Sequence, residues 1–374
     1  MFNTKVSRIT AIINKGSLSA VVQALTANGV RHMQVGAGRA SALEEPRGLR
    51  AILNAGNPSM ANDPVDIVTF LVKQSREDQM IALIADAARL SLPGMGSVYS
   101  EEVNLINSHD SCGINDVPSL SVKKPENLSS ELIGIGCIVQ RGQGDAIARV
   151  VLETGATVPT ITYGYGTGVR DKLGLLRITI PAEKEVLNLV VSRYDAEVVM
   201  ELMIAAGKLN QPGRGFIYTH PVRQGIINNQ ITRGASGHAA SMEQIISALD
   251  SVKGGIEWRR RAGGSASLNA RQFLGGMVNL SLICNEGQAA GLVKAAMQVG
   301  APGATISKMK SVVRESEGKH VSPAREIAVL IISQNQKNDV VEAIRTSGGF
   351  QDASQGEIVA CEVPRAFTYL TPKA

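Results

Sequence analysis

The chain carries one pattern of apolar and polar positions three times. In three segments, apolar residues recur at i, i+3 and i+4, the spacing of the buried stripe of an amphipathic helix. The three segments are 15–30, 141–156 and 286–301. Each opens with a glycine and closes with another (Gly29, Gly155 and Gly300) at the same interval. A closing glycine can adopt the left-handed conformation that ends a helix at little steric cost, so we predict three equivalent helices.

Each predicted helix stands in the same succession of extended segments. A β-type run precedes it, at 9–14, 133–140 and 278–284, and a second follows it, near 32–39, 159–167 and 304–313. We expect a third strand at 65–73, 173–181 and 326–333, then a second helix at about 77–90, 184–206 and 337–347. The fourth strand is expected at 96–106, 215–226 and 357–369. The order strand–helix–strand–strand–helix–strand is the ferredoxin-like (βαββαβ) pattern.

These patterns predict an α+β fold of three tandem ferredoxin-like repeats. We expect repeat 1 at 1–125, repeat 2 at 126–250, a basic linker at 251–277 and repeat 3 at 278–374. Since the sheet of one such repeat has a face that needs covering, we favour an intramolecular pseudo-trimer over three α+β domains on a string. The composition, with 44% hydrophobic and 19% charged residues, is that of a folded chain rather than a disordered one.

Charge and residue usage narrow the function classes. A net charge of +5 and 3% aromatic residues favour anionic small molecules or acidic partners, and we expect no nucleic-acid binding. Four scattered cysteines and five histidines show no metal-ligand spacing. We find no nucleophile motif or paired carboxylates and expect no enzyme. Without a long apolar run, we expect a cytoplasmic protein that does not insert into membranes.

Glycine motifs stand at the ends of the second strands. Repeat 1 has Gly36-Ala37-Gly38-Arg39 and repeat 2 has Gly164-Tyr165-Gly166-Thr167. Repeat 2 also reads AAGKLNQPGRGFIYTHPV at 205–222, between its second helix and fourth strand, and QITRGASGHAA at 230–240. In this ordered set of motifs the chain resembles the nitrogen-regulatory PII signalling family. Members of that family are homotrimers of ferredoxin-like subunits that bind ATP or ADP in clefts between subunits and dock a long loop onto transporters or enzymes.

The resemblance implies a nucleotide site formed mainly by repeat 2. Its loop base would consist of Gly164, Gly166 and Thr167. Its phosphate loop would consist of Gly207, Lys208, Gly213, Arg214 and Gly215, with Arg233 as a C-terminal arginine. Glycines let backbone N–H groups converge on phosphate oxygens, while lysine and arginine add positive charge. In repeat 1 the first element is kept as Gly36, Gly38 and Arg39. A glycine-rich turn with two exposed basic residues is the alternative interpretation.

We therefore expect one good cleft, or two, in a monomer that acts as a pseudo-trimer for nitrogen-related signal transduction. Repeat 1 reads LPGMGSVY where its phosphate loop should stand, and repeat 3 reads SKMKS and ASQGEIV, so repeat 3 is expected to be structural. The effector would be ATP or ADP, with AMP and a role for Mg²⁺ left open. The long insert at 40–64 is expected to contact a partner protein, a transporter or a metabolic enzyme. Two alternatives remain: a ligand-free scaffold, or else an enzyme or a binder of a small anion such as bicarbonate or a carboxylate metabolite.

Overall fold

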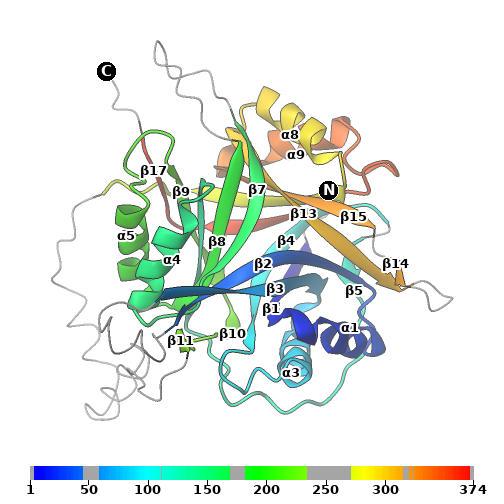
Figure 1. Cartoon of the computed structure of the whole chain (residues 1–374). Helices are drawn as coiled ribbons and strands as arrows, with labels where there is room; N and C mark the ends of the chain where they lie inside the picture. Colours follow the sequence, from blue (N-terminus) through cyan, green and yellow to red (C-terminus); the bar gives the residue numbers. More distant parts are fainter. Residues whose placement is uncertain are drawn as a thin grey trace.

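The computed structural model describes residues 4–44, 59–110, 112–168, 182–233, 271–314, 320–321 and 323–370. Within these ranges the chain has a mixed α+β fold of six α-helices and 17 strands, and strand pairings join all the strands into one large sheet. Figure 1 shows the strands in the middle of the molecule and the helices outside them in three pairs. The pairs are α1 with α3, α4 with α5, and α8 with α9.

The first unit contains the elements between β1 and β4. They are β1 (Thr4–Asn14), α1 (Leu18–Ala27), β2 (His32–Glu44), β3 (Ser59–Val72), α3 (Glu77–Ala87) and β4 (Gly96–Ser108). Strand β1 pairs antiparallel with both β3 and β4, and β3 pairs with β2, so the strand order is β4-β1-β3-β2. The first and third strands, β1 and β3, are therefore the central strands of the unit, and β4 and β2 form its edges.

The second and third units repeat this arrangement. Unit 2 has β6 (Leu132–Gln140), α4 (Gly144–Glu153), β7 (Thr160–Gly168), β8 (Glu183–Ser192), α5 (Ala196–Ala206) and β9 (Gly215–Val222). Unit 3 has β12 (Met277–Asn285), α8 (Ala289–Gln298), β13 (Gly303–Arg314), β15 (Ala324–Ser333), α9 (Lys337–Thr346) and β16 (Glu357–Val363). The pairings give the orders β9-β6-β8-β7 and β16-β12-β15-β13.

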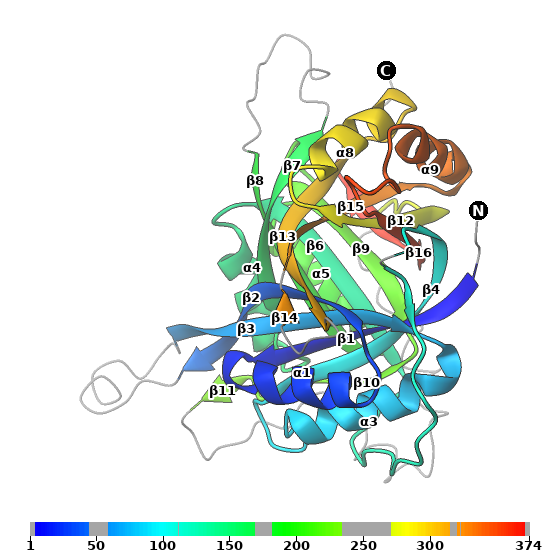
Figure 2. The same ribbon diagram turned by 90° about the vertical axis from the view of Figure 1, so that its right-hand side faces the viewer.

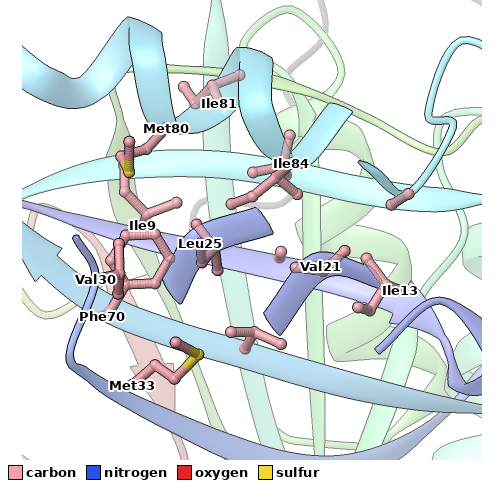
Figure 3. Packing of buried hydrophobic residues seen from close by; sticks show 14 of the residues in the cluster. Ile9, Ile13, Val21, Leu25, Val30, Met33, Phe70, Met80, Ile81 and Ile84 are labelled. Carbon is pink, nitrogen blue, oxygen red and sulfur yellow. The ribbon is translucent and has the colours of Figure 1, made fainter. Parts of the chain in front are cut away.

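Each unit buries a core of its own between one sheet face and its two helices. In unit 1, Ile9 and Phe70 of the sheet pack against Leu25 of α1 and Met80 and Ile84 of α3 (Figure 3). Corresponding clusters lie under α4 and α5 and under α8 and α9. Burying such side chains removes apolar surface from water, the main stabilising contribution to a fold of this kind.

The repeated helices end where the sequence predicts. Helices α1, α4 and α8 are followed by Gly29, Gly155 and Gly300, whose φ angles are +94°, +77° and +103°. These values lie in the left-handed region that residues other than glycine rarely adopt. The glycine pattern is therefore a helix-termination signal, as predicted.

The prediction of a helix over 184–206 is wrong for its first half. Residues Glu183–Ser192 form β8, which pairs with β6 on one side and β7 on the other, and only Ala196–Ala206 is helical. Leu187, Leu189 and Val191 alternate toward the core, which is the two-residue period of a strand. The predicted third strand at 173–181 lies outside the described residues.

The predicted loop at 40–64 is shorter than expected, because both of its ends are strands. Strand β2 runs to Glu44 and β3 begins at Ser59, with Leu43 opposite Met60 in an antiparallel ladder. Residues 45–58 lie outside the described part of the chain.

The second strands of the three units join the units to one another. Strand β13 pairs with β2 over Met309–Val313 and with β7 over Gly303–Ile306, while β2 meets β7 at Arg39 and Ala40. Figure 2 shows β2, β7 and β13 side by side inside the molecule. The polar backbone edges that each unit would otherwise expose are therefore satisfied by its two neighbours.

The segments at and after the fourth strands add a second set of connections, in which each unit pairs with the unit before it around the ring. Strand β10 (Gln224–Ile226) of unit 2 pairs with β4 of unit 1, and β17 (Ala366–Thr368) of unit 3 pairs with β9 of unit 2. The end of β4 in turn pairs with β16 of unit 3. Three further short strands are β5 (Ile114–Asn115), β11 (Thr232–Arg233) and β14 (His320–Val321).

The end of the predicted linker 251–277 is firmly attached to units 2 and 3. Arg271 pairs with Glu201 of α5 at 2.8 Å, and its guanidinium lies over the ring of Phe367. Leu274 bridges to Ala366. Among the helices of the described ranges, none combines the length and the apolar character needed to cross a membrane.

Candidate functional site

Where two units meet, the end of a second strand in one unit faces the start of the second strand in the next, and a cavity lies at each junction. We call these cleft 1–2, cleft 2–3 and cleft 3–1 after the units that form them. Their volumes are about 310, 460 and 290 Å³. The largest falls within the range of about 300–1,000 Å³ common for small-molecule sites.

The glycines of the second strands serve close packing between units. Gly38 of β2 and Gly164 of β7 occupy equivalent positions in their units. Gly38 pairs with Val65 of the third strand in unit 1, and Gly164 pairs with Lys184 of the third strand in unit 2. A Cβ on Gly164 would lie 2.7 Å from the carbonyl oxygen of Ile306 in unit 3, and one on Gly38 would lie 3.1 Å from that of Ile161 in unit 2. The sequence motif thus marks strand contacts between units, and Gly36 faces a central cavity instead.

The turn between α5 and β9 contains the predicted phosphate-loop residues. Lys208 has a left-handed backbone with φ +49°, and Gly213 has φ +70°. Gly215 begins β9 so close to β6 that a Cβ would lie 2.3 Å from the carbonyl oxygen of Ile138. Gln140 donates a hydrogen bond to the Gly213 carbonyl at 3.0 Å, which ties the turn to β6.

Unit 1 has a turn of the same shape, which the sequence analysis described as reduced. Arg89 has φ +55° and Gly94 has φ +77°, and they stand where Lys208 and Gly213 stand in unit 2. Leu90 and Leu209 are buried at matching positions, and each donates its backbone N–H to a carbonyl five residues earlier. The lysine that unit 1 lacks is thus replaced by an arginine at the same left-handed position.

The predicted basic residues are not all gathered at one cavity. Lys208 is exposed and does not line cleft 2–3, and Arg214 contacts Gln211 of its own turn at 3.3 Å. The side chain of Arg233 lies outside the described part of the structure, although its backbone forms β11 beside β2.

Arg39 is engaged in contacts that tie unit 1 to unit 2. Its guanidinium pairs with Asp145 of α4 at 2.5 Å and with Glu185 of β8 at 3.4 Å, and its Nε donates to the Tyr163 hydroxyl at 2.9 Å. Glu185 also accepts the backbone N–H of Gly144 at the start of α4. Since two carboxylates already neutralise it, Arg39 has little charge left for a phosphate.

Cleft 2–3 gathers the loop base of unit 2 against an apolar wall. Gly166, Thr167 and Lys184 belong to its lining. The rest of the lining is largely apolar and comes from both units: Ile138, Phe216, Leu274, Met277, Pro302, Val329 and Ile331. Gly166 and Thr167 also border a neighbouring hollow of about 350 Å³ that includes Lys294 of α8. Two lysines therefore flank the glycine segment, and the turn 207–215 leads directly into Phe216.

Cleft 1–2 has a different character. Its lining includes Gly94 and Gly96 of the unit 1 turn, and Asn14, Asn228 and Gln230. The charged side chain among the described residues that line it is Asp63. A carboxylate opposes the binding of an anion, so this cleft is poorly suited to phosphate.

Cleft 3–1 carries charged side chains of unit 3, although repeat 3 was expected to be structural. Arg325 and Glu357 of unit 3 face His32 and Gln34 of unit 1 across it. Burial raises the pKa of Glu357 to about 7, although Arg325, the backbone N–H of Gly113 and Arg8 act in the opposite direction. Burial also lowers the pKa of His32 below its usual value.

The three units meet around a buried ion-pair network beside a central cavity of about 190 Å³. Arg8 of β1 holds Glu101 of β4 through two contacts of 2.9 Å, and His220 of β9 pairs with the same carboxylate at 2.8 Å. Arg8 also reaches Ser281 of unit 3 at 3.4 Å. Burial alone would raise the pKa of Glu101, but Arg8 and His220 outweigh it and hold that pKa well below its ordinary range.

Sequence patterns alone do not single out Lys184, Arg325, Glu357 or the Arg8–Glu101–His220 network. Lys184 and Arg325 occupy equivalent positions, because each is the partner of the last residue of its unit's first strand, Gln140 or Asn285. An alignment of the third strands reveals this equivalence, which the helix predicted over 184–206 conceals.

No cluster of three or more histidine, cysteine or acidic side chains with metal-binding geometry occurs among the described residues. In comparisons with known proteins, no family model matches the chain, and no curated protein does.

Proposed function

We propose that this chain is a PII-like regulatory protein that binds an adenine nucleotide and acts on a partner protein. In this proposal three ferredoxin-like units form one intramolecular pseudo-trimer that replaces three separate subunits. Two observations support it: the three units share one strand order, and β2, β7 and β13 pair across the unit boundaries. A shared fold alone does not establish function, so the residues that line the clefts carry the proposal.

The nucleotide is assigned to cleft 2–3. The observation that carries this proposal is the meeting of a glycine segment, a lysine and a large apolar wall in one cavity. Gly166 packs against Lys184, which supplies a positive charge, and Phe216 belongs to the apolar part of the lining. A nucleotide needs the same division, since its phosphates require positive charge while its base requires an apolar surface.

The alternative clefts fit a nucleotide less well. Cleft 1–2 is smaller, and its lining carries Asp63. Cleft 3–1 is the smallest, at about 290 Å³, and has Glu357 in its lining. Arg39, part of the predicted site in repeat 1, is already paired with Asp145 and Glu185. One nucleotide per chain is therefore expected.

Signalling requires that the nucleotide bind one conformation of the protein better than another. The partner, by analogy with PII proteins, is a transporter or a metabolic enzyme. Its contact segment is proposed to be the insert between β2 and β3, whose base in unit 1 pairs with β7 of unit 2 at Arg39 and Ala40. Strand β7 carries Gly166 and Thr167, so nucleotide contacts and the insert share one strand connection.

Isothermal titration with ATP, ADP and AMP, each with and without Mg²⁺, tests this proposal on chains shown to be monomeric by light scattering. We expect one site per chain. Lys184→Ala should weaken binding about tenfold, the effect of losing one charge-assisted hydrogen bond. Lys123→Ala is the matched control, because Lys123 is exposed and pairs only locally with Glu126. Lys208→Ala tests the turn separately.

Absence of heat with every nucleotide, on a folded monomer, would contradict the proposal. Equal affinity in the parent chain and in Lys184→Ala would place the site elsewhere.

A further inference from the structure

Arg325 is a buried cation without a negatively charged neighbour at hydrogen-bond distance within the described residues. Its side chain lines cleft 3–1, and the residue is only 3% exposed. Its guanidinium donates to Asn285 Oδ1 at 2.6 Å, to the Gln355 carbonyl at 2.7 Å and to Cys112 Sγ at 3.5 Å, all of them neutral acceptors. Its Nε is buried and has no hydrogen-bond partner. A guanidinium taken out of water without a counter-charge is costly, which is unusual unless a ligand supplies the charge.

The other wall of the cleft carries an unpartnered acceptor. Gln34 of β2 donates through Nε2 to Ser311 Oγ at 3.4 Å, but its Oε1 is buried and accepts no hydrogen bond. Most buried polar atoms in folded proteins have a partner, so two unpartnered buried atoms on residues that line the same cavity are a specific signal. One of these atoms, Nε of Arg325 in unit 3, is a hydrogen-bond donor, and the other, Oε1 of Gln34 in unit 1, is an acceptor.

We infer that cleft 3–1 binds a small carboxylate that also bears an N–H donor, the chemical class of free α-amino acids. The ligand carboxylate accepts from Nε of Arg325, and the ligand ammonium or amide donates to Oε1 of Gln34. A volume of about 290 Å³ admits a molecule of this size but is tight for a nucleotide. This inference concerns a different cleft from the proposed nucleotide site and does not depend on it.

The remaining lining of the cleft agrees with a ligand that carries both charges. Arg8 also lines it, but its charge is already matched by Glu101. Glu357, with its pKa raised to about 7 by burial, is about half ionised at neutral pH and leaves the charge of Arg325 partly uncompensated. A ligand ammonium would favour the ionised form of Glu357, and a ligand carboxylate would balance Arg325.

The test is ligand-observed NMR on the full chain with three probes of matched size: glycine, acetate and methylammonium. Glycine should bind in the range of ~1 mM, as small polar ligands do, and acetate about tenfold more weakly because it lacks the N–H donor. Methylammonium should not bind. Nucleotide titration of the same samples provides an independent measurement, since it reports on cleft 2–3.

Two substitutions assign the site. Arg325→Met should abolish glycine binding. Arg345→Met should leave it unchanged, because Arg345 is an exposed arginine of α9 that pairs with Glu342.

Because Arg325 also binds Asn285 and Gln355, its loss can impair folding, so Gln34→Met is the second variant. Gln34→Met should reduce glycine affinity about tenfold and leave acetate binding unchanged. Gln230→Met, in the lining of cleft 1–2, is its control.

Three results would overturn the inference: no binding of glycine by the folded parent chain, glycine binding that survives both Arg325→Met and Gln34→Met, or equal affinity for glycine and methylammonium. Retained glycine binding in a chain that fails to bind nucleotides would support this inference while contradicting the proposed nucleotide function.

Discussion

Clefts 2–3 and 3–1 occupy equivalent places between units, yet two positions give them different chemistry. The partner of the first strand's last residue is Lys184 in one cleft and Arg325 in the other. The partner of Ile138 is Phe216, while the partner of Ile283 is Glu357. A lysine beside an aromatic ring suits an anion with an apolar body, whereas an arginine beside a carboxylate suits a small zwitterion. One backbone frame thus supports different sites, because side chains at its rim change without altering the strand pairings.

The largest expected effect comes from breaking the buried ion-pair network beside the central cavity, where the three units meet. Glu101→Gln removes the negative charge between Arg8 and His220 and should lower the free energy of unfolding by about 3–5 kcal/mol, the usual cost of breaking a buried ion pair. Urea unfolding measures this loss. Glu102→Gln, which breaks the more exposed pair with Lys5, should cost less than about 1 kcal/mol.

The pH dependence of that effect has a definite sign. Since the folded state lowers the pKa of Glu101, the carboxylate stabilises the fold above its unfolded pKa and loses this contribution as the pH falls. The parent chain should therefore lose stability in acid more steeply than Glu101→Gln. Parallel acid profiles for the two chains would mean that the network does not stabilise the fold.

The second test concerns Glu357, which occupies in cleft 3–1 the position that Phe216 occupies in cleft 2–3. Because burial raises the pKa of Glu357 to about 7, the folded state holds this proton more tightly than the unfolded state. Stability is then lost as the pH rises from ~4.5 through 7, by about 3 kcal/mol in all. Glu357→Gln should recover that amount at pH 8 and change little at pH 4, as measured by urea unfolding at both values. Groups that act on Glu357 are Arg325, Arg8 and the Gly113 N–H.

The third test asks whether the motif glycines serve packing between units. Gly164→Ala should destabilise the chain by about 2 kcal/mol, since the new methyl group meets backbone of unit 3 at 2.7 Å. Gly36→Ala is the matched control, because a Cβ there has no atom within 4 Å. Thermal unfolding of the two variants distinguishes them, and equal melting temperatures would exclude the packing role.

The smallest effect is expected from a substitution that gives cleft 2–3 the carboxylate found in cleft 3–1. Phe216→Glu places a carboxylate where unit 3 has Glu357 and should weaken nucleotide binding about tenfold, or ~1.4 kcal/mol. Phe216→Leu keeps the apolar wall and should bind nearly as well as the parent chain. Titration with ADP compares the two, and unchanged affinity in Phe216→Glu would separate the nucleotide from this cleft.

Much of the fold could be predicted from local sequence signals. The helix-ending glycines Gly29, Gly155 and Gly300 are such a signal, since a left-handed residue is required at one position of the chain. Strand β8 was missed because its segment, EKEVLNLVVS, has both helix-forming and strand-forming residues. Its pairing with β6 and β7 decides in favour of a strand, and such pairing is a tertiary contact.

The candidate sites were predictable only in part, for the same reason. The glycine segment of β7 does line cleft 2–3. Lys208 and Arg214, which the predicted nucleotide site also includes, are not in the lining of that cleft. Lys184 and Arg325 have no motif around them, so nothing local distinguishes them from other basic residues. They are recognised by their strand partners and by their position in the lining of a cavity between units.

The sequence by itself determined the threefold repetition, the helix ends and most of the strands, because these depend on residues near one another in the chain. Only the tertiary structure decided which charges are matched and which are not. Arg39 and Arg8 meet carboxylates from α4 and β4, while the hydrogen-bond acceptors of Arg325 among the described residues are neutral, although all three are arginines on strands. The difference arises because the counter-charge of a buried group comes from segments far away in sequence, which only the packing of the three units brings together.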